Sequence, residues 1–252
     1  MGIVFDARKF NSKRSPNGEL SNAYEISRIV YLAVDALEGS DNLSFKLNKN
    51  LLSIKGKRSK FSGDQTFNSL KIKGSFGNID PENEKTWKSA TVDQIQYKGR
   101  EGILNIREIG DKGSLGTLYD WDNTERVIEF LFRGDDIIYS DKNVRTDHNL
   151  RGYGGDDIMY LYGGESAEGG KGKDKFVVTK EAVKYMQTKR RDVDDIFIDD
   201  ASSSEGDTVE ILGNPKDFSL YTNGRQLEYE TDYGEINIES KRGRVLADFV
   251  AI

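Results

Sequence analysis

The sequence predicts a mainly β protein with one amphipathic helix, and three observations lead to this fold class. Six short segments between residues 43 and 132 alternate apolar and polar side chains, as half-buried strands do. A single stretch, 26–37, repeats apolar residues at helical spacing. Residues 131–175 hold nine of the chain's 26 glycines, set beside aspartates and followed by β-formers. We therefore expect three parts: an N-terminal α+β domain (1–130), a short coil of parallel strands (131–213) and C-terminal capping strands (214–252).

The N-terminal part is predicted to be one amphipathic helix packed on an antiparallel sheet. The helix has its apolar side chains on one stripe, at Ile26, Ile29, Val30, Ala33, Val34 and Leu37. Its polar face holds too few Lys and Arg residues for a helix that lies on a membrane. The predicted strands are 43–47, 51–55, 70–74, 92–97, 103–108 and 127–132, with a hairpin turn at 99–102.

Three glycine-rich loops precede short apolar segments in the second part. GGKGKD (Gly169–Asp174) matches the repeat G-G-x-G-x-D-x-U-x of a Ca²⁺-binding parallel β-helix. GYGGDD (Gly152–Asp157) lacks one glycine, and RGDD (Arg133–Asp136) keeps the second half. Calcium takes about six to eight oxygen ligands, and glycine lets a tight loop turn several carbonyls toward one point. The final aspartates are 21 and 17 residues apart, so the loops are predicted to stack in one row.

These motifs resemble RTX (hemolysin-type calcium-binding repeat) proteins of the bacterial type I secretion route, as in the β-roll of serralysin-type and alginate-epimerase-type secreted proteins. The resemblance implies a short parallel β-roll with an ion between successive loops, hence about two Ca²⁺ ions for three loops. The expected oxygen donors are Gly134, Asp135, Asp136, Gly152, Gly154, Gly155, Asp156, Asp157, Gly169, Lys171, Gly172 and Asp174. Lys171 and Lys173 would oppose a cation unless their side chains point outward. A second row, near 141–149 and 163–166, matches the repeat poorly and is expected to bind little metal.

The chain beyond the last loop resembles the segment that closes RTX rolls. Asp195, Asp199 and Asp207 are candidates for a further ion site, with turn caps as the alternative. The tail GRVLADFVAI, with Asp248 before Phe249, resembles the uncleaved type I secretion signal. The sequence has no cysteine and no apolar N-terminal leader. These features predict a secreted, extracellular bacterial protein that is exported by the type I secretion machinery.

Composition and missing motifs narrow the chemistry. A net charge of −6 and a pI near 5.1 argue against a general nucleic-acid role, and no apolar run is long enough to span a membrane. His148 is the only histidine, which excludes the zinc site of serralysin proteases, and we expect it in a loop. No nucleophile elbow, phosphate loop or EF-hand is present, so no catalytic residue is assigned. Trp87 and Trp121 either stack on sugar rings or fill the core.

We therefore expect a secreted calcium-binding protein whose roll folds on Ca²⁺ and supports an N-terminal binding or adhesion domain. Its expected partners are calcium and an extracellular polysaccharide or cell-surface ligand. The alternative is a secreted polysaccharide-active enzyme (lyase, epimerase or hydrolase) with its active site in residues 1–130 and the roll as a secretion and stability module. A cleft there with clustered, pKa-shifted Tyr, Lys or Glu residues would favour the enzyme.

Overall fold

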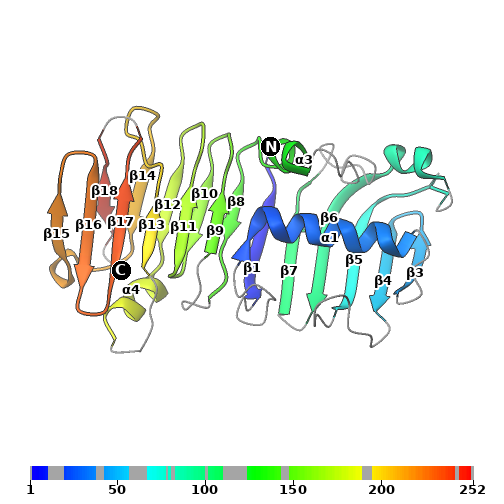
Figure 1. Ribbon diagram of the computed structural model, residues 1–252, viewed down its shortest axis with the longest axis horizontal. Helices are drawn as coiled ribbons and strands as arrows, with labels where there is room; N and C mark the ends of the chain where they lie inside the picture. Colours follow the sequence, from blue (N-terminus) through cyan, green and yellow to red (C-terminus); the bar gives the residue numbers. More distant parts are fainter. Residues whose placement is uncertain are drawn as a thin grey trace.

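The computed structural model describes residues 2–10, 20–37, 43–56, 67–77, 79–80, 83–99, 102–109, 124–142, 148–188, 195–241 and 244–250. Within these ranges the protein is an elongated, mainly β molecule built from two large sheets (Figure 1). Sheet A has the order β18 (Ala247–Phe249), β14 (Thr208–Ile211), β12 (Lys175–Val178), β10 (Ile158–Leu161), β8 (Ile137–Tyr139), β1 (Val4–Phe10), β7 (Gly102–Arg107), β6 (Thr91–Gly99), β5 (Phe67–Ser75), β4 (Leu51–Gly56) and β3 (Leu43–Asn48). Sheet B has the order β15 (Ser219–Thr222), β16 (Gln226–Thr231), β17 (Gly234–Glu239), β13 (Ile196–Ile198), β11 (Glu165–Glu168), β9 (His148–Arg151) and β2 (Leu20–Ser21). The described helices are α1 (Asn22–Leu37), α3 (Thr124–Leu131) and α4 (Lys180–Met186), with 3-10 turns at Glu84–Ser89 and Pro215–Asp217.

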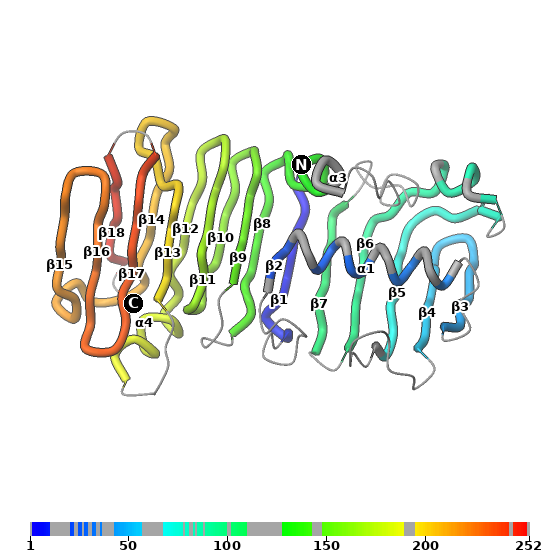
Figure 2. Tube along the Cα trace, in the orientation of Figure 1, coloured from blue at the N-terminus to red at the C-terminus, as the bar shows by residue number. Residues whose placement is uncertain are grey.

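From β8 to β14 the chain moves to the other sheet at every successive strand, and all of these strands pair in parallel. We call this part, together with β17 and β18, the two-sheet coil. Its strands step along the molecule from green to red in Figure 2. Most inward side chains of the two sheets are small or aliphatic, with Phe176 and the polar His148 and Glu165 as exceptions, so they fill a narrow interior. Ile138, Met159, Leu150 and Ala167 are among them, and none is exposed.

Strand β1 joins the coil to the N-terminal part, because it pairs in parallel with β8 and antiparallel with β7. Helix α1 then continues the layer formed by sheet B. Strand β2 pairs with β9, and the side chain of Asn22 exchanges hydrogen bonds of 2.7 and 3.3 Å with the backbone of Arg151. Beyond that point α1 runs across strands β1 and β7 to β3 and covers one face of sheet A (Figure 1).

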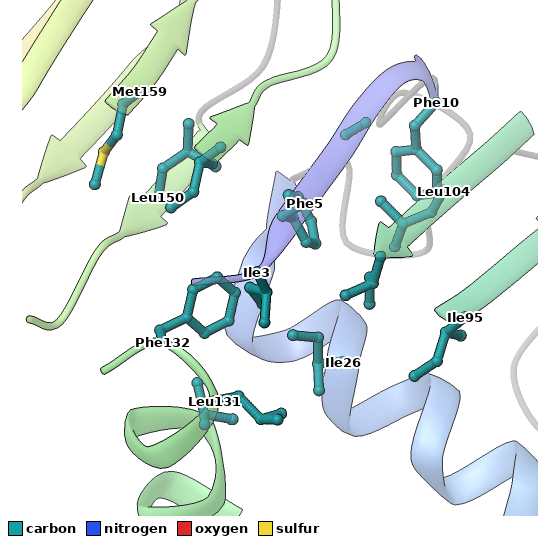
Figure 3. Close-up of a cluster of buried hydrophobic side chains, with 14 of the residues drawn as sticks. Ile3, Phe5, Phe10, Ile26, Ile95, Leu104, Leu131, Phe132, Leu150 and Met159 are labelled. Carbon is teal, nitrogen blue, oxygen red and sulfur yellow. The ribbon is translucent and has the colours of Figure 1, made fainter. Parts of the chain in front are cut away.

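The two parts share one hydrophobic core. Figure 3 shows Phe132 and Leu131 meeting Ile3 of the N-terminal segment and Ile26 of α1. Leu150 of the coil belongs to the same cluster. Sheet A therefore runs without interruption from the antiparallel strands to the parallel ones.

The N-terminal elements agree with the sequence prediction except for one segment. The mainly β class is confirmed, and in the described N-terminal residues helix α1 lies on the antiparallel strands β3 to β7. The predicted strand 127–132 is wrong, because this segment belongs to helix α3. Its buried residues Ile128, Leu131 and Phe132 follow the i, i+3, i+4 spacing of a helix. The prediction instead took the apolar run for the two-residue alternation of a strand.

The C-terminal strands cap the coil. Strands β15, β16 and β17 form antiparallel hairpins in sheet B, and β18 adds a parallel strand to β14 in sheet A. Phe249, in the tail that resembles a secretion signal, packs with Phe218 and Tyr229 at ring-centroid distances of 5.4 and 5.2 Å. Within residues 244–250 this tail is thus part of the packed cap.

Candidate metal centre

The structure brings the three predicted loops together in one row. Parallel pairing aligns Ile137 with Ile158 and Ile158 with Lys175, so the aspartates just before these residues lie one above another. The same register aligns Lys175 with Thr208 and adds Asp207 as a fourth member. We call Asp136, Asp157, Asp174 and Asp207 the aspartate row. It lies at the upper edge of the coil in Figure 1, where the chain enters the strands of sheet A.

Hydrogen bonds link each member of the aspartate row to the next. The backbone N–H of Asp136 donates to Oδ1 of Asp157 at 2.8 Å, and the N–H of Asp157 donates to Oδ1 of Asp174 at 2.9 Å. The N–H of Asp174 donates to Oδ1 of Asp207 at 2.8 Å. At the first end, the N–H of Ile3 donates to Oδ1 of Asp136 at 2.5 Å. One carboxylate oxygen of each aspartate therefore closes the ladder between neighbouring loops.

The second carboxylate oxygen of the two middle aspartates is different. Asp157 and Asp174 are each 1 % exposed, and Oδ2 of each has no hydrogen-bond partner in the described part of the chain. Burial raises the pKa of the Asp157 carboxyl to about 9, and the nearby carboxylates of Asp136 and Asp174 add to the rise. Burial likewise raises the pKa of Asp174 to about 7, with a contribution from Asp207. Two buried carboxyl groups thus lie side by side, and burial without a cation favours their protonated forms.

Glycine makes this close stacking possible. A Cβ at Gly155 would overlap the carbonyl group of Gly134, and a Cβ at Gly172 would overlap the carbonyl oxygen of Gly155. Both residues also have positive φ values, of 122° and 138°, which side chains other than glycine disfavour. The glycines two residues before each aspartate therefore let the loop backbones approach one another.

Oxygen atoms of neighbouring loops converge beside Gly152. A methyl group on this residue would overlap Oδ2 of Asp157 and would lie 2.5 Å from the carbonyl oxygen of Gly169 in the next loop. A methyl group on Gly169 would in turn overlap Oδ2 of Asp174. A carboxylate oxygen and a carbonyl oxygen are hard donors of the kind that Ca²⁺ prefers, so the residues present fit a calcium ion. Within the described ranges no three acidic or histidine side chains form a metal-binding group, so carbonyl oxygens have to complete the set.

The other predicted donors lie around this row. Asp135 and Asp156 are exposed and form an outer ladder, in which the N–H of Asp156 donates to Asp135 at 3.0 Å. The carbonyl oxygen of Lys171 accepts the N–H of Gly155 at 2.8 Å, and Gly154 forms an isolated bridge with Lys171. Lys171 and Lys173 are exposed, so their side chains stay in solvent rather than in the aspartate row.

The remaining candidate aspartates behave differently from one another. Asp207 belongs to the aspartate row, but its Oδ2 accepts the N–H of Ser202 at 2.7 Å. Asp199 lies at the same end of the coil and accepts the hydroxyl of Ser166 at 2.7 Å. Asp195 lies at the opposite end of β13, where it accepts the N–H of Glu235 at 3.0 Å. The three predicted carboxylates therefore do not form one site.

The opposite row of turns holds a buried polar cluster that sequence reasoning missed. His148 was expected in a loop, but it begins strand β9 and its side chain is fully buried. Its Nδ1 lies 3.1 Å from Oγ of Ser140 and 3.8 Å from Oε1 of Glu165, and its Nε2 lies 3.7 Å from Oδ2 of Asp141. The imidazole is therefore enclosed by a hydroxyl and two carboxyl groups inside the coil. Glu165 reaches it because β9 pairs in parallel with β11, which places Glu165 opposite His148. Because the side chain is inaccessible, we assign this cluster to the stability of the coil.

The tryptophans and the surface hollows bear on the choice between sugar binding and catalysis in the N-terminal part. Trp87 is 1 % exposed and donates its indole N–H to the carbonyl of Asp80 at 3.2 Å, so it fills the core. Trp121 lies outside the described residues. The hollows of about 530 and 620 Å³ that the described surface forms lie on residues 180–232, at the far end of the coil.

Three comparisons with known proteins found no significant similarity, so the geometry above is the basis for interpreting the site. No protein-family model, no curated protein and no solved structure is significantly similar to the chain. Among the described helices, none has the length and apolar character needed to cross a membrane.

Proposed function

We propose that this is a secreted calcium-binding protein in which the two-sheet coil is an RTX-type β-roll that folds on Ca²⁺ and supports an N-terminal binding or adhesion domain. The observation that carries the proposal is the pair of buried carboxylate oxygens, Asp157 Oδ2 and Asp174 Oδ2, for which the described residues provide no hydrogen-bond partner. A buried ionised carboxylate is strongly destabilising unless a proton, a hydrogen-bond donor or a cation offsets its charge. Calcium offsets the charge of both groups at once.

The ion expected between the second and third loops has Asp157, Asp174 and the carbonyl of Gly169 as its donors, with further loop carbonyls completing the set. A second ion is expected between the first and second loops, near Asp136 and Gly152. The gap beside Asp207 is a poorer candidate, because the Oδ2 of that residue already accepts a hydrogen bond. Two ions therefore remain our proposal.

Calcium binding is coupled to folding in this arrangement. The donors come from loops that are far apart in sequence and meet only when the strands of sheet A are paired. An ion that binds only the folded chain stabilises it by mass action. Extracellular calcium modules work at about 10⁻⁴–10⁻³ M calcium, and the chain contains no cysteine, so we propose that it is exported by a type I route and folds outside the cell.

The test is thermal unfolding of the full chain followed by circular dichroism. We expect the melting temperature to rise in millimolar calcium relative to chelator, and to rise much less in magnesium, which demands a stricter octahedral geometry. Titration calorimetry should then give about two ions per chain. Equal melting curves in calcium and chelator, with no heat of binding, would contradict the proposal.

The enzyme alternative gains no support from the described residues. It required a cleft with clustered titratable groups in residues 1–130, whereas the hollows above lie on residues 180–232.

A further inference from the structure

The face of the N-terminal sheet opposite α1 carries mainly positive charge. Alternation along strands β3 to β7 sends one set of side chains into the core under α1 and the other set outward. The positively charged members of the outward set are Lys46, Lys55, Lys71, Lys73, Lys98 and Arg107, which we call the basic face. Within strands β3 to β7 the side chains paired with them in the cross-strand rows are neutral, and the row through Asn105 meets Asp6 where it continues into β1. This is a marked separation of charge, since the whole chain has a net charge of −6.

Strand register brings these cations close together. Lys46 pairs with Ser53, and Ser53 with Lys71, so the two lysines lie in one cross-strand row. Lys73 lies in the adjacent row, which ends in Arg107. Five strands spaced about 4.8 Å apart span roughly 19 Å, so the basic face is wide enough for several units of a polymer.

Among the described residues, no acid neutralises the lysines of the basic face. All five are exposed, and none forms an ion pair with any residue in the described ranges. The carboxylate of Asp6 lies 2.8 Å from Arg8 and 3.8 Å from Arg107, at the edge next to the coil. Asp93 is exposed in β6 at the bulge beside Gln94, so one acid borders the row of Lys73, and Glu108 is exposed just beyond the end of β7. Like charges at this spacing repel one another, and a bound polyanion relieves the repulsion.

We propose that the basic face binds an acidic polysaccharide, a linear glycan with carboxylates along its length. The positive charge of the basic face favours a polyanion as its partner. The neutral residues between the cations distinguish a polysaccharide from a single-stranded nucleic acid. No described aromatic side chain lies in these rows within strands β3 to β7. Where one row continues through Asp6 to Tyr139 of β8, the guanidinium of Arg8 lies 4.1 Å from the centroid of that ring, so bases of single-stranded nucleic acid find no free stacking platform among the cations. The amides of Gln94, Gln96 and Asn105 lie between the cations and suit sugar hydroxyls. This inference names the partner of the binding domain, and so rests on the proposed function in that one respect.

The test is calorimetric titration of the full chain, in calcium, with a galacturonate oligomer, and with neutral dextran as the comparison. We expect binding of the oligomer only, weakening as sodium chloride is raised, since surface charges are screened by salt. Replacing Lys46, Lys71 and Lys73 together by Gln should weaken binding about tenfold, if each exposed contact contributes about 0.5 kcal/mol. The matching Lys→Arg triple variant should retain binding.

A matched control removes three exposed lysines at the far end of the molecule, as Lys180→Gln, Lys184→Gln and Lys216→Gln. This variant has the same charge and the same coil, and should bind as the wild type does. Equal binding by the two Gln variants, no binding of the oligomer at low salt, or tighter binding of oligothymidylate or phosphatidylserine vesicles would each overturn the proposal. Calcium dependence of melting is measured separately, so the two proposals can fail independently.

Discussion

Replacing Asp157 by Asn should have opposite effects in chelator and in calcium. The amide keeps an oxygen that accepts the N–H of Asp136. It also removes the negative charge from the buried position where Oδ2 lacks a partner. Without metal the variant should therefore be more stable than the wild type, and with metal it should gain less.

The size of the effect follows from the pKa of this carboxyl. At pH 8, the metal-free folded chain holds a proton on a group of pKa about 9, whereas the unfolded chain has the ordinary value of 3.8. Roughly four pH units at 1.36 kcal/mol each set an upper limit of about 6 kcal/mol on the cost of burying Asp157. Relaxation of the loop lowers this cost, so we expect a gain of about 2–4 kcal/mol, or roughly 5–10 °C in melting temperature.

The assay is thermal unfolding at pH 8 in chelator and in saturating calcium. Calcium at about 100 times its dissociation constant should stabilise the wild type by about 2.7 kcal/mol for each bound ion and the Asp157→Asn variant by much less. Asp232→Asn removes an exposed carboxylate from the turn between β16 and β17, and should change neither result. A lower melting temperature of Asp157→Asn in chelator, or an undiminished gain in calcium, would refute this account of the aspartate row.

Three further predictions follow from the same geometry. In chelator, stability should fall as the pH rises from about 4 to about 9, because folding raises the pKa values of Asp157 and Asp174 and the unfolded carboxyls lose their protons first; melting scans across this range measure it. Gly155→Ala should cost at least about 2 kcal/mol in urea unfolding, whereas Gly224→Ala, also at positive φ but with nothing within 4 Å, should cost about 1 kcal/mol. Phe132→Ala should cost about 3–5 kcal/mol, with one cooperative transition by both near- and far-ultraviolet circular dichroism, since this ring lies in the core shared by both parts.

Some features were accessible from the sequence because they depend on local pattern. The 21- and 17-residue steps between aspartates predicted stacked loops, and the register of Ile137, Ile158 and Lys175 agrees with that prediction. Alternation predicted the antiparallel strands, because a half-buried sheet needs one apolar face. The short run 127–132 misled the prediction, since so few residues fit both a strand and a helix.

Other features depended on contacts between distant residues. Asp207 follows Asp174 by 33 residues, an interval that contains α4 and is much longer than the two nonapeptides of a regular turn of the coil. The repeat spacing alone therefore did not place Asp207 in the aspartate row. His148 looked like a loop residue because its partners, Asp141 and Glu165, reach it from other strands and turns. The basic face was hidden in an acidic composition, since its lysines come from several strands and gather only when these pair in register.

The sequence by itself determined the mainly β class, the glycine–aspartate loops and the helix that covers the sheet, because each is written in residues that are neighbours along the chain. Tertiary structure alone decided which carboxylate oxygens are buried without a partner and which charges share a face. Both depend on strand pairing, which brings together side chains from different strands and removes water from some of them.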